Sequence, residues 1–193
     1  DPFVLIPFDV FKTAIYNDYG VFTGEDISTQ GMEYLKPENR KNILGLQAQL
    51  WTETVKGQEM MEYYAVPKLF AYAEKAWAKA PEWETEPNSG KRIQAIENDW
   101  NELANRIGQN EFARLDKMSG GFAYRIPLPG AIVENDTLKA NISFPGITIR
   151  YTTDGAEPDV NSPVYEKPVK VNGKVLIRAF APNGRPGRSW SVN

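Results

Sequence analysis

The stretch that decides the fold of this chain is Ile43-Leu44-Gly45-Leu46-Gln47-Ala48-Gln49-Leu50-Trp51-Thr52-Glu53. Residues 43–50 are mostly apolar and carry no charge, which is typical of a strand buried on both faces of a parallel sheet. Trp51 and Glu53 follow where this strand ends. In an α/β barrel the carboxyl ends of the strands form the active-site face. An aromatic side chain so close to a carboxylate at that place predicts a sugar site.

Residues 57–80 are expected to form a helix that follows this strand. Pro67 has no backbone N–H, so it should kink the helix or shift its start. Apolar side chains recur at helical spacing and give a broad face that would pack on a barrel; they are Met60, Tyr63, Tyr64, Leu69, Ala73, Ala76 and Trp77.

These residues resemble the last barrel strand and helix of the β-N-acetylhexosaminidases, glycoside hydrolase family 20. The chitobiase-like members carry the motif G-L-x-A-Q-x-W-[ST]-E, which stands here between Gly45 and Glu53. The resemblance continues through Met61-Glu62-Tyr63, Pro67 and Ala73-Glu74-Lys75-Ala76-Trp77. It implies exo-hydrolysis of terminal N-acetylglucosamine or N-acetylgalactosamine by a substrate-assisted retaining mechanism, in which the acetamido group of the substrate is the nucleophile.

The resemblance implies substrate-binding roles for Trp51 and Glu53. Trp51 would lie under the apolar face of the terminal sugar, and Glu53 would accept hydrogen bonds from its outer hydroxyls, at positions four and six. The alternative is structural: Trp51 plugs the barrel core, and Glu53 is a surface or salt-bridged carboxylate.

The catalytic pair of the family is not expected in this chain. That pair is an adjacent Asp-Glu, and the sequence has no His and no Asp-Glu dipeptide. The nearest approach, Glu25-Asp26, is reversed and lies in a polar stretch. A complete barrel takes about 250 residues, whereas this chain has 193. We therefore expect the C-terminal fragment of a longer enzyme, inactive alone. Its unpaired barrel strand should associate in a dimer, in a swapped arrangement or with the remainder of the same polypeptide.

The C-terminal third has a different period. Short alternating strands are expected at 131–133, 138–142, 148–152, 169–171 and 175–180, separated by turn dipeptides such as Asn172-Gly173 and Asn183-Gly184. This pattern predicts a small antiparallel sandwich of immunoglobulin type. The run from Arg150 to Pro158, R-Y-T-x-D-G-x-x-P, resembles the C-terminal domain of chitobiases and hexosaminidases. Asp154-Gly155 in that run is explained by a turn without a metal or other ligand.

The predicted architecture is an α+β composite. Residues 1–82 are expected to be the C-terminal piece of a (β/α)8 catalytic barrel, and residues 122–193 the β-sandwich. Residues 83–121 would connect them by a helix from about Lys91 to Met118 that Gly108 interrupts and Gly120-Gly121 ends.

Composition excludes several other function classes. The net charge of −3 gives no reason to expect nucleic acid as a partner, and no apolar run approaches a membrane span. Cysteine and histidine are both absent, which excludes thiol catalysis and a Ser-His-Asp triad. We expect no metal and no cofactor. The expected parent is bacterial and either periplasmic or extracellular.

Two functions remain open at this point. In the first, the chain completes the barrel of a hexosaminidase and binds an N-acetylhexosamine-terminated glycan through Trp51 and Glu53. In the second, the β-sandwich is a noncatalytic module that holds a glycan or a protein through Tyr151, Tyr165 and Trp190. A flat, exposed row of those aromatic side chains would favour the second function, but we expect Tyr151 and Tyr165 to face inward or lie at an edge.

Overall fold

The computed structural model describes residues 37–42, 44–45, 50–51, 53–79, 81–84 and 86–192. The chain divides into two compact units. The helical unit contains the described residues up to Val55 together with those of Tyr64–Asn101. The β unit contains Lys56–Tyr63 and the residues from Glu102 onward.

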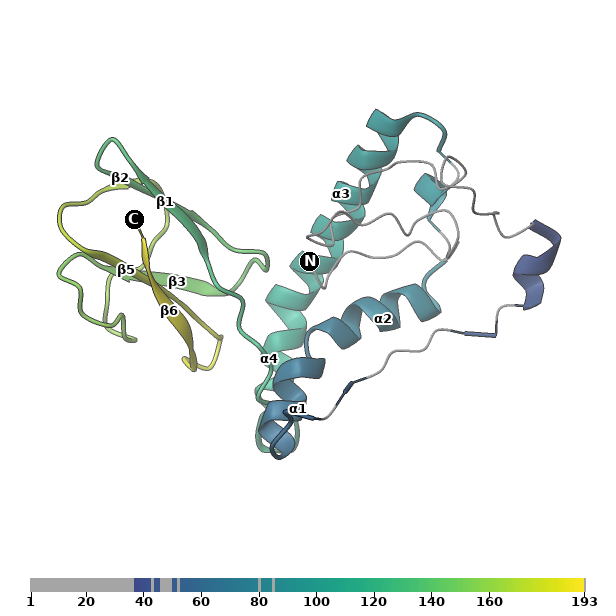
Figure 1. The fold of residues 1–193 in the computed structure, drawn as a ribbon, viewed down its shortest axis with the longest axis horizontal. Coiled ribbons are helices and arrows are strands. Elements are labelled where there is room, and N and C mark those ends of the chain that lie inside the picture. The colour runs from purple at the N-terminus through teal and green to yellow at the C-terminus, as the bar shows by residue number, and fades with distance from the viewer. Residues whose placement is uncertain are drawn as a thin grey trace. The chain divides into compact units, whose positions relative to one another are not determined.

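The described helices lie between residues 37 and 120 (Figure 1). A 3-10 turn, η2 (Pro37–Asn42), precedes α1 (Gln58–Ala65) and α2 (Lys68–Trp77). Val66 and Pro67 separate these two helices, so the interruption predicted at Pro67 is confirmed. The turn η3 (Glu82–Glu84) leads to α3 (Ser89–Arg106). Asn88 caps α3, because its side-chain oxygen accepts a hydrogen bond from the Lys91 N–H at 3.0 Å.

Trp83 anchors the connector between α2 and α3 within the helical unit. Its side chain is only 4% exposed, and its indole N–H donates to the Asp99 carboxylate on α3. The Lys75 ammonium on α2 lies 5.4 Å from the ring centroid, a cation–π distance. Both helices are therefore tied to this one aromatic side chain.

After α3 the helix widens. The π-helical turn η4 (Ile107–Glu111) contains Gly108, followed by α4 (Phe112–Leu115) and the 3-10 turn η5 (Met118–Gly120). A side chain at Gly108 would collide with the Pro145 carbonyl oxygen of a turn between strands. Glycine thus permits this close approach of two backbones. The helix expected to run to about Met118 and to end at Gly120-Gly121 ends earlier, because α4 stops at Leu115. The two glycines instead close the 3-10 turn η5, with positive φ angles of 84° and 101°.

Two antiparallel three-stranded sheets make up the C-terminal part (Figure 1). One has the order β1 (Gly130–Glu134), β2 (Thr137–Asn141), β4 (Val169–Lys170). The other has the order β3 (Thr148–Thr152), β5 (Val175–Phe180), β6 (Pro186–Val192). The five expected strands are confirmed, whereas β6 had not been expected.

Side chains from both sheets share one apolar core. Its buried residues are Leu138, Ile149, Val171, Val175, Ile177 and Val192. The β1–β2 hairpin turns at Asn135 and Asp136, whose φ angles are 50° and 55°. Two consecutive positive φ angles define a type I′ turn, which matches the right-handed twist of paired strands. The sheets thus form a two-layer β structure, and its immunoglobulin type stays a prediction.

The barrel part of the prediction falls largely outside the described residues. Residues 43 and 46–49 of the expected strand, and the Glu25-Asp26 stretch, are among those not described. Leu44, Gly45 and Leu50 are described and lie in no helix or strand. A (β/α)8 barrel therefore stays a prediction as well.

Candidate functional site

Trp51 and Glu53 lie in the irregular segment that precedes α1. Trp51 is 75% exposed, and Glu53, also exposed, occupies a turn. Neither side chain makes a hydrogen bond or an ion pair with the part of the chain that the structure describes. Both are therefore accessible to a ligand here, while their role in binding a sugar stays a prediction.

The chain enters α1 through a sharp turn. Gly57 has a φ of 81°, a left-handed conformation that favours glycine. Its carbonyl accepts the N–H of Met61 at 3.3 Å, which closes the first turn of the helix. Residues 54–57 are the only link between Glu53 and the first residue of α1, Gln58.

Glu62, on the second turn of α1, is a charged side chain that the β unit buries, with 6% of its surface exposed. One carboxylate oxygen accepts the backbone N–H of Ala123 at 2.7 Å, and the other accepts the Gln58 amide at 2.7 Å. The hydrogen bond from Ala123 is the main reason that the pKa of Glu62 lies below its ordinary value. These bonds satisfy both oxygens, as a buried carboxylate requires.

A second contact joins the same two segments. The Arg125 guanidinium lies 5.7 Å from the centroid of the Tyr63 ring, within the range of a cation–π interaction. Sequence reasoning assigned no role to Glu62 or Arg125. The one available signal was Glu62 itself, a carboxylate between the apolar side chains of Met61 and Tyr63.

Tyr124 is the centre of a buried cluster in the β unit. Its ring stacks on Phe112 at 4.5 Å, and Phe112 meets Phe144 edge-on at 5.3 Å. The Tyr124 hydroxyl donates to Asp116 at 3.0 Å. Burial, followed by the hydrogen bond to Asp116, raises the pKa of the Tyr124 phenol well above its ordinary value. The cluster thus fixes α4 to the segment that leads into β1.

Asp116 extends this cluster to the loop between β5 and β6. It accepts the Asn183 side-chain amide at 2.9 Å and the Asn183 backbone N–H at 3.1 Å. Arg185 donates to the Tyr124 carbonyl at 2.9 Å, and its guanidinium lies 4.5 Å from the Tyr124 ring centroid. Helix and sheets are therefore joined by polar as well as apolar contacts.

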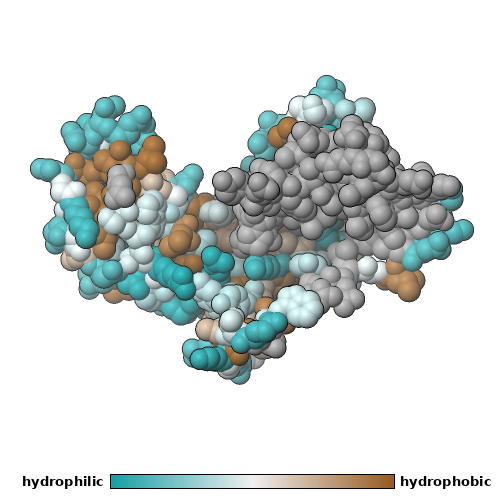
Figure 2. Space-filling model, viewed as in Figure 1, coloured by the Kyte–Doolittle hydropathy of each residue, from teal (hydrophilic) through white to brown (hydrophobic). Residues whose placement is uncertain are grey.

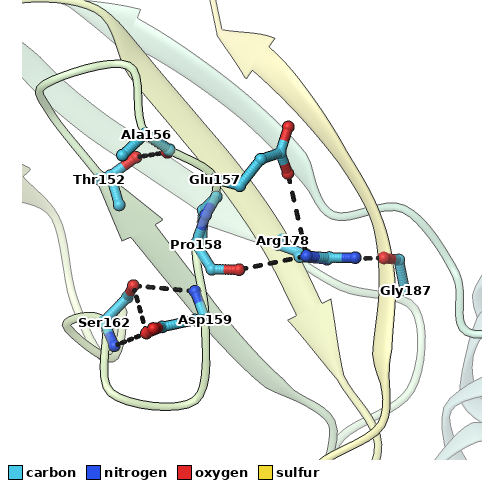
Figure 3. Close-up of polar contacts among 8 residues, drawn as sticks. All are labelled: Thr152, Ala156, Glu157, Pro158, Asp159, Ser162, Arg178 and Gly187. Carbon is cyan, nitrogen blue, oxygen red and sulfur yellow. Dashed lines mark hydrogen bonds and ion pairs between the residues drawn. The ribbon is translucent and has the colours of Figure 1, made fainter.

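The signature run from Arg150 to Pro158 forms a loop that is stabilised by hydrogen bonds within the loop. Asp154 accepts the N–H of Ala156 at 3.0 Å, and Gly155 has a φ of 81°. The Thr152 hydroxyl donates to the Ala156 carbonyl at 2.5 Å (Figure 3). The turn predicted at Asp154-Gly155 is confirmed, and these bonds explain both residues without a ligand.

Arg178, on β5, holds the end of this loop against β6. Figure 3 shows its guanidinium between the loop and Gly187: it donates to the Gly187 carbonyl at 2.7 Å and to the Pro158 carbonyl at 3.4 Å. The Glu157 carboxylate lies 3.9 Å away. Asp159 continues the loop by accepting the backbone and hydroxyl of Ser162 at 2.9 and 3.1 Å. Glu157, Asp159 and Arg178 therefore have structural partners.

The aromatic side chains proposed for the binding module are also used internally. Tyr151, Tyr165 and Trp190 are half-buried and pack against the sheet core. The Tyr165 oxygen accepts the N–H of Ala140 at 2.9 Å, and the Trp190 indole donates to the Pro129 carbonyl at 3.0 Å.

The surface of the sheets offers aliphatic rather than aromatic side chains. On the part of the visible face that Figure 2 colours, hydrophobic and hydrophilic residues both occur. Among the described residues from 122 to 192, the exposed large apolar side chains are Leu128, Ile132, Val160 and Val164. That part of the chain thus lacks the flat aromatic row that the module would need.

The described part of the chain offers neither a cluster of metal ligands nor a membrane-spanning helix. It contains no group of three or more Asp, Glu, His or Cys side chains that could hold a metal ion. None of the helices found there is both long and apolar enough to cross a membrane.

Comparison with protein-family models finds a match in each part of the chain. Residues 12–80 match the glycosyl hydrolase family 20 catalytic domain. Residues 111–189 match the chitobiase/beta-hexosaminidase C-terminal domain. The resemblance drawn from the sequence is therefore confirmed in both parts of the chain.

Individual relatives agree with these matches. The chain is 35% identical to an N,N'-diacetylchitobiase of Vibrio harveyi over 185 residues, 86% of this chain and 20% of that protein. It is 32% identical to a beta-hexosaminidase of Vibrio vulnificus over 176 residues, 80% of this chain and 20% of that protein. The chain thus spans about a fifth of the length of the curated relatives it matches.

Proposed function

We infer that this chain is the C-terminal part of an exo-acting β-N-acetylhexosaminidase. Its substrate would be a glycan that ends in N-acetylglucosamine or N-acetylgalactosamine. The observation that carries the proposal is the match to both family domains, in order, along one chain. The share of about a fifth of each relative supports a longer parent protein, and the bacterial relatives suggest a bacterial parent. For that parent we propose a periplasmic or extracellular location.

Trp51 and Glu53 supply this chain's part of the terminal-sugar subsite. The indole covers the axial hydrogens of the sugar and excludes water from that face. The carboxylate accepts hydrogen bonds from the hydroxyls at positions four and six. A site built to bond a hydroxyl rejects an analogue that lacks it, because the polar group of the protein is then left unpaired.

The reaction proceeds by substrate assistance with retention, with the acetamido oxygen of the substrate as the nucleophile. The general acid and the carboxylate that orients the acetamido group come from the remainder of the same polypeptide. General acid catalysis contributes about 10²- to 10⁴-fold. The 193-residue chain alone is therefore expected to release no nitrophenol from nitrophenyl N-acetylglucosaminide. Hydrolysis at the rate of the parent enzyme would contradict this.

A substitution in the parent enzyme tests the subsite. Glu53→Gln should lower kcat/KM for the normal substrate far more than for substrates deoxygenated at position four or six, because the lost bonds are made only to those hydroxyls. Glu59→Gln is the matched control, since Glu59 is an exposed carboxylate on the neighbouring helix. Equal losses on the normal and deoxy substrates would overturn the role of Glu53.

A further inference from the structure

Glu62 is buried at a position that neither sugar binding nor catalysis explains. Burying a carboxylate is unfavourable unless hydrogen bonds compensate. Here the compensation comes from the Ala123 N–H and the Gln58 amide, each at 2.7 Å. Of these, only Ala123 lies outside α1. The effect of the arrangement is therefore to fix α1 to a residue far along the chain.

The surrounding contacts show that this connection is not isolated. Arg125, two residues after Ala123, covers the ring of Tyr63, the residue after Glu62. Lys56–Tyr63 accordingly belongs to the same compact unit as the two sheets. The N-terminal part of α1 is thus held by the β unit, although in sequence it directly follows the segment of Trp51 and Glu53.

The link between Glu53 and α1 is short. Five Cα–Cα steps separate Glu53 from Gln58, so the link spans at most about 18 Å when fully extended, and Gly57 already turns the chain at a φ of 81°. A short link restricts the positions that Glu53 can take once the start of α1 is fixed. Loss of the anchor at Glu62 would release that restriction.

We propose that Glu62 is a positioning residue: its bond to the Ala123 N–H fixes the start of α1 and so restrains the segment that carries Trp51 and Glu53. The C-terminal β domain then restrains the position of the sugar subsite through α1. This role rests on the proposed function of Trp51 and Glu53. The lowered pKa of Glu62 agrees with it, because the carboxylate keeps its charge, and its acceptor strength, in mildly acidic solution.

The test uses the full-length protein with three single variants. Glu62→Ala removes the acceptor, and Glu62→Gln keeps an amide oxygen that can still accept the Ala123 N–H. Arg178→Met is the matched control, because it breaks bonds to Gly187 and Pro158 within the same unit without touching α1. Each variant is assayed on nitrophenyl N-acetylglucosaminide at the same interval below its own Tm, so that lost stability alone does not change the rate.

We expect kcat/KM of Glu62→Ala to be about tenfold below that of the unsubstituted enzyme, mainly because KM rises. Glu62→Gln should restore most of the activity, and Arg178→Met should retain it. When Glu53→Ala is already present, adding Glu62→Ala should cost little more, because residues that act through one another are non-additive. Equal losses in Glu62→Ala and Arg178→Met, or full additivity with Glu53→Ala, would overturn the proposal.

Amide hydrogen exchange provides a readout that does not depend on activity. In Glu62→Ala, exchange should accelerate at Ala123 and across residues 53–57, whereas Arg178→Met should leave those amides unchanged. If the unsubstituted protein hydrolyses no hexosaminide, the proposed function is wrong. Hydrogen exchange alone then tests whether Glu62 fixes α1. Unchanged exchange at residues 53–57 in Glu62→Ala would overturn the proposed restraint in either case.

Discussion

Replacing Phe112 by alanine should destabilise the β unit strongly. Phe112 is fully buried, stacks on Tyr124 at 4.5 Å and meets Phe144 edge-on at 5.3 Å. Removing a buried phenylalanine side chain costs about 3–5 kcal/mol of unfolding free energy, since the cavity collapses only partly. Each aromatic pair accounts for about 0.5–1.5 kcal/mol of such a loss. We therefore expect a loss of about 4 kcal/mol.

The assay is thermal unfolding of the 193-residue chain followed by near-ultraviolet circular dichroism, which reports on packed aromatic rings. For a chain of this size, about 4 kcal/mol corresponds to a fall in Tm of roughly 8–16 °C. The control is Ile132→Ala, because Ile132 is an apolar side chain that is 54% exposed; it should change stability by less than about 1 kcal/mol. Similar Tm values for the two variants would refute the idea that this cluster joins α4 to the sheets.

Three further outcomes are expected. Gly108→Ala should destabilise the chain by about 1–3 kcal/mol, because the added methyl group meets the Pro145 carbonyl. Gly90→Ala, in the first turn of α3, is the control, and equal Tm values for the two variants would contradict the clash. The Tyr124 phenol, whose pKa is raised, should contribute stability that is complete below the unfolded pKa of about 10 and is lost as pH rises above it; an ultraviolet titration in which every tyrosine ionises before unfolding would refute this. The pKa of Glu62 is lowered, so its contribution is present above the ordinary value of 4.5 and lost as pH falls below it; a stability difference between Glu62→Gln and the unsubstituted chain that is independent of pH would contradict it.

Most secondary structure could be predicted because local chemistry determines it. Pro67 interrupts the helix since it lacks a donor, and the glycines at 120 and 121, which have positive φ, close the 3-10 turn that follows α4. Strand β6 was missed because it begins at Pro186-Gly187, residues that disfavour strands. Residues 186–192 form a strand because they pair with β5. This pairing has an irregular register between Arg178 and Phe180.

The candidate site could be predicted only as far as a motif extends. Trp51 and Glu53 are adjacent enough in sequence for spacing and family resemblance to select them. The bond from Ala123 to Glu62 joins residues that are 61 positions apart, and no periodicity encodes such a pair. The same holds for Asp116 and Asn183, which meet across 67 positions. Contacts of this kind depend on the tertiary fold, so they are found only in a three-dimensional structure.

The central claim is that Trp51 and Glu53 form part of a terminal-sugar subsite, and a crystal structure of the full-length protein with N-acetylglucosamine tests it most directly. The account predicts that the Trp51 indole lies against the apolar face of the sugar. It also predicts that the Glu53 carboxylate oxygens lie about 2.5–3.0 Å from the hydroxyls at positions four and six. A sugar bound with those hydroxyls held by other side chains, or bound on the β-sheets alone, would contradict the account.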